Sequence, residues 1–327
     1  MDHLLHDALK EIRILDLSRL LPGPLATDIL ASYGATIYKV ELKGIRYDTK
    51  QLPPFKNGVS TLYDLLNHRK KVSQIDLESD DGRKQLKDLI QHADVIIEQF
   101  RPGFLFQYGL DAKSVQALND QIIYISPTGY GQTGSRKDWP GHDINFMAES
   151  GLLDMNRSHT GQPIIPAVQI ADIVGGSYQL VIQCMAAIIG KKYGAVIDIA
   201  MLDGVKPLMT FPLSQINGDM DPHQFRLLSG GLVNYNVYQC ANKEWVALGA
   251  LELKFWNRFC DLVNKPTWKR EDIISLQTDY FDKDKVDELF QSKTVNEWVL
   301  LNEKHFFCLS KVRTLKEVTE EQIPVKE

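Results

Sequence analysis

The sequence is poor in cysteine, and it lacks the features of disulfide-stabilised and membrane-spanning proteins. Its four cysteines are far apart and contain no CxxC pair, so we expect reduced core thiols, not disulfides or zinc ligands. They are Cys184, Cys240, Cys260 and Cys308. The N-terminus has no basic start followed by a long apolar run, so no signal peptide is predicted. The longest apolar stretch, about residues 180–190, is shorter than the ~20 residues that span a bilayer. We therefore expect a cytoplasmic protein with no membrane partner.

An excess of positive charge is also missing. The chain has 37 Lys and Arg against 42 Asp and Glu, a formal net charge of -5. Without a whole-chain positive field, broad nucleic-acid binding is not expected, and a phosphate-bearing ligand would need local basic groups. The apolar fraction of 44% is ordinary for a globular protein, and 327 residues suffice for one large domain or two of ordinary size.

The first two hundred residues alternate strand-like and helical patterns. Residues 12–17 form an apolar run, residues 24–33 have a helical pattern between Pro24 and Gly34, and residues 36–41 form a second apolar run. Further strands are expected at 72–77, 94–100, 122–126 and 195–201, with a helix at 81–91. Strands that alternate with helices predict an α/β fold: a large, doubly wound, Rossmann-like parallel-sheet domain over residues 1–210. The pattern does not give the strand order.

The pattern changes beyond about residue 210. Residues 235–248 suggest two short strands around Asn242-Lys243, followed by helices at 255–262 and 295–301. We therefore expect a second, smaller α+β domain over residues 211–327.

A histidine stands at the predicted start of a helix. The segment Gly141–Phe146 (GHDINF) follows Pro140 and precedes an apolar helical pattern, which places His142 at the helix entrance. An imidazole there can move protons near neutral pH, beside backbone N–H groups that can stabilise a developing oxyanion. From the spacing alone, an ordinary histidine with Asp143 as a helix cap is the simpler interpretation.

Asp172 precedes the most apolar helical segment of the chain. Gly175 and Gly176 follow it and permit close approach by backbone or ligand. The carboxylate can act as a base or a nucleophile in a tight cleft. Composition alone favours a helix cap.

Basic residues stand at two expected strand boundaries. Arg101 follows a strand, where ligands of open α/β sheets gather. Arg69, Lys70 and Lys71 precede another strand, and a solvated charge cluster is the simpler interpretation for the two lysines. The glycine-rich segment 129–134 lacks the GxGxxG spacing, so a nicotinamide-nucleotide site is not predicted.

Seven segments together, in this order, resemble the family III CoA-transferase superfamily (CaiB/BaiF type), and most closely its α-methylacyl-CoA racemase branch. The resemblance covers about residues 10–315. Its segments are Asp16–Glu41, Arg46–Asp48, Asp94–Gly103, Tyr130–Gly134 (YGQTG), Gly141–Phe146, Ala171–Gly176 (ADIVGG) and Leu248–Phe255 (LGALELKF).

The resemblance implies roles for four residues in the chemistry. By position, His142 and Asp172 are similar to the racemase's two bases on opposite faces of the α-carbon. Glu252 resembles the residue that orients the histidine. The Asp143 amide resembles the donor to the thioester oxygen.

The resemblance also implies the ligand and the assembly. Arg101 resembles a contact to a CoA phosphate, Tyr130 and Gly131 resemble residues that line the channel, and Lys43 and Arg69 are further candidates for CoA binding. An acyl-CoA substrate is expected, with no cofactor beyond the coenzyme A that it carries. Two chains are expected to form an interlocked homodimer.

Three departures from the racemase pattern accompany these expectations. Leu42-Lys43 stands where racemases usually carry an arginine, and Phe306-Phe307 replaces an acidic residue before Cys308. The sequence ends soon after residue 315, without the family's C-terminal return segment.

Two alternatives remain from the sequence. A CoA transferase would use Asp172 as the nucleophile and carry CoA as a thioester on it. Such relatives usually lack a histidine at the position of His142, which favours proton transfer here. The second alternative is a non-catalytic acyl-CoA binder, which would leave the acid–base residues idle.

Overall fold

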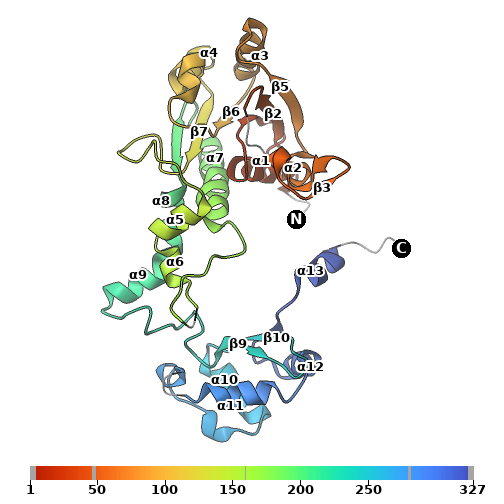
Figure 1. The fold of residues 1–327 in the computed structure, drawn as a ribbon, viewed down its shortest axis with the longest axis vertical. Helices are drawn as coiled ribbons and strands as arrows, with labels where there is room; N and C mark the ends of the chain where they lie inside the picture. Colours follow the sequence, from red (N-terminus) through yellow and green to blue (C-terminus); the bar gives the residue numbers. More distant parts are fainter. Residues whose placement is uncertain (1–4, 46–48, 159, 279–280, 323–327) are drawn as a thin grey trace. The chain divides into compact units, whose positions relative to one another are not determined.

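The computed structural model describes residues 5–45, 49–158, 160–278 and 281–322 (Figure 1). It divides into two compact units, Met1–Phe211 and Pro212–Glu327. The Arg46–Asp48 segment of the family pattern lies outside the described residues.

The first unit is built on a six-stranded sheet in which every neighbouring pair is parallel. The strand order is β5-β2-β1-β6-β7-β8. The strands are β1 (Arg13–Leu17), β2 (Thr36–Leu42), β5 (Lys71–Ile75), β6 (Val95–Glu98), β7 (Ile123–Thr128) and β8 (Val196–Ala200). Numbered along the chain, these six have the order 3-2-1-4-5-6 of dinucleotide-binding folds. The α/β class predicted from the alternating pattern is confirmed.

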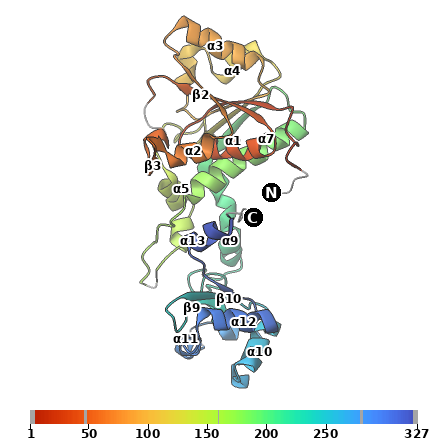
Figure 2. The same cartoon turned by 90° about the vertical axis from the view of Figure 1, so that its right-hand side faces the viewer.

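Apolar side chains cover both faces of this sheet. Leu15 and Leu17 of β1 pack in one core, whereas Ile14 between them packs in the other, because successive side chains of a strand point to opposite faces. Helices α3 (Asp80–Gln91) and α4 (Ala112–Leu118) cover the first face, and α1 (Pro22–Ser32) and α7 (Gln179–Ile189) cover the second (Figure 2). The unit is therefore doubly wound.

The strand order reverses between β1 and β6. Chain connections leave these two neighbours in opposite directions, so a crevice opens beyond their carboxyl ends, at Leu17 and Glu98. This is the position at which open α/β sheets bind ligands.

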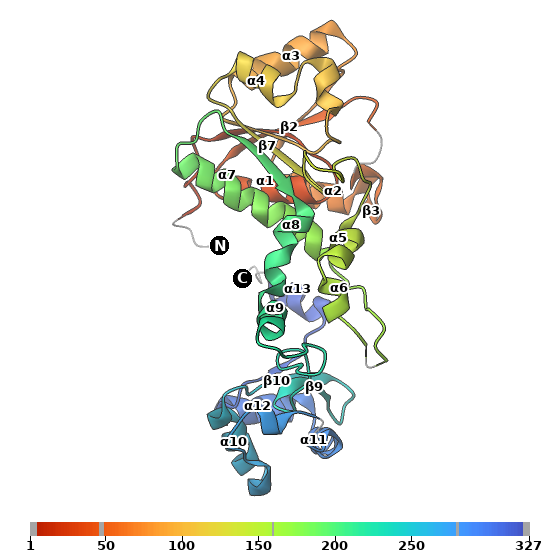
Figure 3. The same cartoon turned by 90° about the vertical axis from the view of Figure 1, so that its left-hand side faces the viewer.

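One long apolar helix lies in this unit. The turn η4 (Ala171–Tyr178) has π-helical hydrogen bonding and continues directly into α7 (Figure 3). Together they form a 19-residue segment, Ala171–Ile189, which is long and apolar enough to cross a membrane by length and composition only. The expectation that the apolar stretch is too short was wrong, because η4 extends it. Leu180, Cys184 and Ala187 of this helix are buried in the core on one face of the sheet, whereas 33% of its apolar window is buried in all.

The remaining elements of the first unit are short. They are β3 (Phe55–Lys56), β4 (Val59–Ser60), α2 (Thr61–Asn67), α5 (Asp143–Glu149), α6 (Leu152–Met155) and α8 (Met201–Val205), with the 3-10 turns η2 (Thr49–Gln51), η3 (Phe104–Tyr108) and η5 (Lys206–Met209). Helix α9 (Thr210–Asn217) follows at the boundary of the two units.

The second unit has an antiparallel sheet of order β11-β10-β9. Its strands are β9 (Tyr235–Gln239), β10 (Trp245–Gly249) and β11 (Leu309–Lys311); its helices are α10 (Leu253–Leu262), α11 (Lys283–Phe290), α12 (Val295–His305) and α13 (Leu315–Gln322), with η6 (Pro266–Trp268) and η7 (Ile274–Leu276). The β9–β10 hairpin turns at Asn242-Lys243 as predicted. Its core is aromatic: Phe259 stacks with Phe290 and packs against Trp256, Trp298 and Phe307.

Three of the four cysteines are core residues as predicted. Burial raises the pKa of Cys184 and of Cys260 to about 12, which keeps both thiols protonated. The prediction was wrong for Cys308, which is exposed because the neighbouring Phe307 fills the core at that point.

Candidate active site

A small hollow lies in the crevice beyond the carboxyl ends of β1 and β2. Its volume is about 120 Å³. The lining side chains include Leu17, Ser18, Arg19, Glu41, Lys50 and Phe100. Lys50 comes from η2, and the others come from the ends of β1, β2 and β6 or directly after them, at one edge of the parallel sheet.

The hollow is cationic and has an aromatic wall. The Arg19 guanidinium lies 5.2 Å from the centre of the Phe100 ring. Lys50 binds Glu41 at 2.5 Å and lies 4.7 Å from the Tyr63 ring, and the Tyr63 hydroxyl donates to Glu41 at 2.6 Å. Arginine and lysine side chains can bind phosphate groups, and an aromatic surface beside them can pack against a flat ring of the same ligand.

The three cations predicted to bind CoA differ in their surroundings. Arg101 is exposed on the turn after β6. Arg69 Nη1 donates to both carboxylate oxygens of Asp28 at 2.9 Å, and Lys43 Nζ donates to Asp76 at 3.0 Å. Arg69 and Lys43 therefore already have carboxylate partners on the protein.

The prediction of a solvated cluster was wrong for Lys70. Its ammonium is buried and lies 3.3 Å from an oxygen of Asp16, whereas Lys71 is exposed as predicted. The turn between α2 and β5 points Lys70 inward against β1, where the Asp16 carboxylate neutralises it. The buried carboxylate lowers the free-energy cost of burying the Lys70 ammonium.

His142 stands at the start of a helix, as predicted. Its backbone N–H donates to Asn145 Oδ1 at 3.0 Å, which fixes the first turn of α5. The histidine is exposed. Beneath it, the Phe146 ring fills the space at Gly129 and Gly141, where an added Cβ would lie 2.5 and 2.7 Å from ring atoms. The glycines thus allow α5 to lie directly against the glycine-rich loop.

The helix that carries Asp172 is joined to α5 by one hydrogen bond. The backbone N–H of Asp172 donates to Asp143 Oδ1 at 3.0 Å. Close packing holds the η4 turn: a Cβ on Gly175 would lie 2.2 Å from the Met201 carbonyl oxygen, and one on Gly176 would lie 2.8 Å from Pro22 Cβ. Wide π-helical turns of this kind often occur at functional sites.

Burial, and after it the negative charge of Asp143, together raise the pKa of Asp172 to about 7. At neutral pH this carboxyl therefore exchanges a proton readily. A group whose pKa lies near the working pH is suited to both accept and return a proton.

Tyr130 and Gly131 lie on the loop after β7. The Tyr130 hydroxyl donates to Glu149 of α5 at 2.9 Å, and its ring packs edge-on against Phe146. Gly131 has a positive φ of 86°, and its N–H donates to Thr128 Oγ1 at 3.0 Å. Both residues line a second, polar hollow of about 390 Å³, which also includes Asp198.

Glu252 lies in the second unit, where it is the exposed N-cap residue of α10. No cluster of three or more metal-ligating side chains occurs within the part of the chain that the structure describes.

The sequence reasoning missed two features of this region. It assigned the Asp143 amide a role but not the carboxylate, which binds Asp172 and raises its pKa. It also missed Arg19 and Lys50 as lining residues of the hollow. The order SRLLPGP directly after a strand was the available signal for Arg19, because a turn at that position borders the crevice.

The strand order and the helices on both faces of the sheet define a doubly wound α/β protein. Residues 9–326 match the family model for CoA-transferase family III. The chain is 30% identical to human alpha-methylacyl-CoA racemase over 320 residues, which cover 95% of this chain and 79% of that protein. It is 32% identical to human succinyl-CoA:glutarate CoA-transferase over 264 residues, covering 79% of this chain and 60% of that protein.

Solved structures agree on the fold. A CaiB/BaiF family protein from Brucella suis matches with a TM-score of 0.80 and 22% identity, covering 96% of this chain and 86% of that one. Rv3272 from M. tuberculosis matches with a TM-score of 0.81 and 25% identity, over the same shares of both chains. The chain belongs to CoA-transferase family III.

The raised pKa of Asp172 predicts a pH-dependent stability. An unfolded aspartate ionises near pH 4, whereas Asp172 holds its proton to about pH 7 when folded, so the folded state loses relative stability as pH rises from 4 to 7. Asp172→Asn should remove this loss, which is at most about 4 kcal/mol. In urea unfolding at pH 8, the variant should have a larger free energy of unfolding than the wild type. At pH 4 the difference between the two free energies should be smaller. An equal difference at both pH values would show an ordinary pKa for Asp172.

Proposed function

We propose that the protein acts on 2-methylacyl-CoA thioesters and inverts the α-carbon by removing and returning its proton, with His142 and Asp172 as the two bases. The observation that carries the proposal is the pKa of Asp172 near 7, on a helix that is hydrogen-bonded to the helix beginning after His142. The sequence similarity to a racemase over 95% of the chain supports it.

The chemistry follows from what a thioester requires. Removal of the α-proton pushes charge onto the thioester oxygen and forms an enolate. The proposed donor to that oxygen is the Asp143 amide, and one such oriented donor typically contributes about 3–4 kcal/mol to the transition state. Return of a proton by the second base, on the opposite face, gives the other configuration. The proton taken by one base is replaced by the proton held on the other.

The carboxylate of Asp143 has a separate part in this proposal. It accepts the Asp172 N–H, which holds the first turn of η4, and its charge keeps the Asp172 proton in place near pH 7. Asp172 can therefore begin a cycle either protonated or ionised. A two-base reaction needs both forms, since each direction begins from a different one. Glu252 is the proposed residue that orients His142.

For the coenzyme, the proposed site is the hollow beyond β1 and β2, with Arg19 and Lys50 toward the phosphates and Arg101 at its margin. Tyr130 and Gly131 are proposed to line the path of the acyl chain. Beyond the coenzyme A of the substrate, no further cofactor is proposed.

CoA transfer is the second candidate, and the similarity to a succinyl-CoA:glutarate CoA-transferase favours it. In that reaction Asp172 attacks the thioester carbonyl and expels the CoA thiolate, which leaves a mixed anhydride between Asp172 and the acyl group. The thiolate then attacks the Asp172 carbonyl of the anhydride, which releases the acyl group as a free carboxylate and forms a CoA thioester on Asp172. Loss of His142 separates the two candidates, since this nucleophilic route does not use it.

The protein is further proposed to form an interlocked homodimer. The outer face of the η4–α7 helix supports this, because Tyr178, Ile182 and Ile189 recur on one helical stripe and are exposed by 48%, 58% and 74%. Val196, on the edge strand β8, is also exposed. Such a row of apolar side chains is typical of a surface that a second copy covers.

His142→Ala should abolish racemisation of a 2-methylacyl-CoA, with a loss of about 10²–10⁴-fold or more, because one of two bases is missing. Slow deuterium uptake from the face served by Asp172 can persist. The measurement is mass spectrometry and chiral analysis of the thioester after incubation in heavy water. His92→Ala, which removes an exposed histidine at the end of α3, is the matched control.

Hydroxylamine, added to the same samples, tests the alternative CoA-transfer reaction. It converts Asp172 into a stable hydroxamate, with release of the carboxylate or CoA, only if an anhydride or thioester has formed on Asp172. A trapped adduct at Asp172, with CoA movement that requires a free acid and no deuterium uptake, would establish the transferase instead.

Arg101→Ala should weaken CoA binding by about tenfold and reduce its salt dependence, because a charge-assisted hydrogen bond to phosphate is lost. Calorimetry at two salt concentrations measures both effects. Lys84→Ala, on the exposed side of α3, is the control for loss of one positive charge. Unchanged affinity would remove Arg101 from the binding site.

Ile182→Asp should weaken dimerisation, because it places a charge in the proposed apolar contact. Sedimentation velocity over a hundredfold concentration range should then detect a monomer that the wild type does not release. Leu65→Asp, an exposed position on α2, serves as the control. A wild-type protein that sediments as a monomer at every concentration would contradict the dimer.

A further inference from the structure

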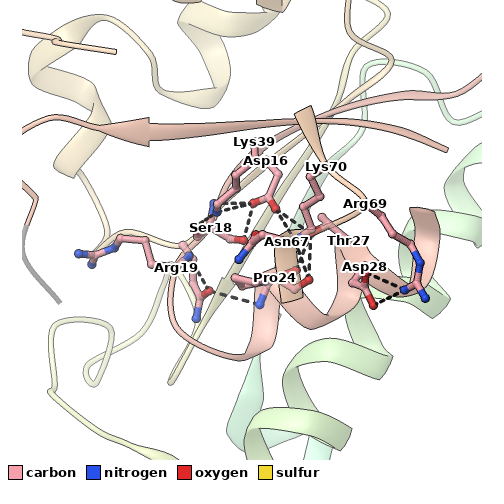
Figure 4. Close-up of polar contacts among 12 residues, drawn as sticks. Asp16, Ser18, Arg19, Pro24, Thr27, Asp28, Lys39, Asn67, Arg69 and Lys70 are labelled. Carbon is pink, nitrogen blue, oxygen red and sulfur yellow. Dashed lines mark hydrogen bonds and ion pairs between the residues drawn. The ribbon is translucent and has the colours of Figure 1, made fainter. Parts of the chain in front are cut away.

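A group of buried charges adjoins the proposed CoA site, since Lys39 of this group lines the hollow; Figure 4 shows the group. Asp16 of β1 is fully buried, and the ammoniums of Lys39 and Lys70 lie 3.2 and 3.3 Å from its two carboxylate oxygens. We call these three residues the Asp16 cluster. Burial lowers the pKa of Lys70 to about 8, although attraction to Asp16 opposes the shift. The cluster holds two positive charges against one negative charge.

The hydrogen bonds of the cluster converge on one turn, Ser18–Pro24, which joins β1 to α1. Asp16 accepts from the Ser18 N–H at 2.8 Å and from the Ser18 hydroxyl at 2.5 Å. Lys39 donates to the Ser18 carbonyl, and Lys70 donates to the Pro24 carbonyl at 2.8 Å. One end of the turn is thereby held by Lys39 of β2, and the other by Lys70 from the turn before β5.

This turn borders the proposed coenzyme site on one side. Ser18 and Arg19 line the hollow, and Arg19 lies over Phe100. The Gln99 side-chain oxygen accepts the N–H groups of Arg19 and Gly23, each at 3.4 Å, so the turn is also tied to the end of β6.

On the other side the same turn meets the helix of Asp172. The Ser177 hydroxyl donates to the Pro22 carbonyl at 2.8 Å, and Gly176 lies against Pro22 without room for a Cβ. Ser177 also donates to the Asp172 carbonyl at 3.4 Å. The turn is therefore a direct structural link between the hollow and Asp172.

We infer that the Asp16 cluster positions the Ser18–Pro24 turn, and through it both the coenzyme hollow and the Asp172 helix. Burying such charges gives little net stability, since replacement by apolar residues is often neutral or stabilising. The cluster instead supplies hydrogen bonds of fixed direction to turn carbonyls that apolar residues cannot bind. Asp16 and Lys70 are positioning residues, since neither lines the hollow within the described part of the chain.

This inference rests on the proposed acyl-CoA function, and its test includes a readout that does not depend on CoA. Lys70→Met keeps most of the side-chain length and removes the donor to Pro24. We expect the dissociation constant for CoA, measured by calorimetry on the full chain, to rise by about tenfold or more. We also expect faster amide hydrogen exchange in peptides covering residues 18–24 and 171–178, with no change over 295–305.

Lys71→Met is the matched control, because the adjacent ammonium is exposed over the Tyr38 ring and away from the turn. It should leave both readouts unchanged. If Lys70→Met does not fold, Thr27→Val keeps every charge and removes only the hydroxyl that donates to Asp16 at 2.7 Å. It should shift both readouts in the same direction, with a rise of about threefold in the dissociation constant.

The outcomes are distinct. A folded Lys70→Met variant with a lower unfolding temperature, wild-type CoA affinity and wild-type exchange at both segments would overturn the inference and leave the proposed function intact. A wild-type protein that binds no CoA, together with faster exchange at both segments in the variant, would overturn the proposed function and support the positioning role.

Discussion

The hydrogen bond from the Asp172 amide to the Asp143 carboxylate is the contact on which the site depends. It joins η4 to α5, and so it fixes Asp172 relative to the helix that begins after His142. The same carboxylate, by its charge, helps burial to hold the pKa of Asp172 near 7. One group thus supplies both the geometry and the protonation state, which explains why an acid stands beside the proposed catalytic acid.

Close backbone packing makes this contact possible. Gly175 and Gly176 let η4 lie directly against Met201 and Pro22, and Gly141 leaves room for Phe146 beneath the start of α5. Side chains at these glycines would push η4 away from Met201 and Pro22, and α5 away from the loop at Gly141. The site is therefore held by close packing at these glycines and by the directed hydrogen bond between Asp172 and Asp143.

Much of the fold could be predicted from hydrophobic periodicity. The alternation of strands and helices in the first 200 residues corresponds to a doubly wound sheet, because apolar runs bounded by turn residues are typical of fully buried parallel strands. The strand order was not predictable, since periodicity says which face of a strand is buried and not which strand is its neighbour. The surroundings of Asp172 followed only from the structure, because desolvation depends on residues distant in sequence.

Charged residues caused the clearest error. Lys70 stands in a run of basic residues, which is typical of a solvated surface, yet it is buried against Asp16 of a strand 54 positions away. Lys39 shows a related pattern, because this lysine stands within an apolar strand, between the buried Ile37 and Val40 of β2. A charge inside an apolar strand requires a partner, but the sequence does not identify which acid supplies it.

Titration of Asp172 shows directly whether this carboxyl exchanges its proton near neutral pH. Infrared difference spectra of wild type minus Asp172→Asn, recorded without CoA from pH 4 to 9, isolate the carbonyl band of the protonated carboxyl. We expect this band to be present at pH 5 and to disappear around pH 7. A carboxyl already fully ionised at pH 5 would contradict it.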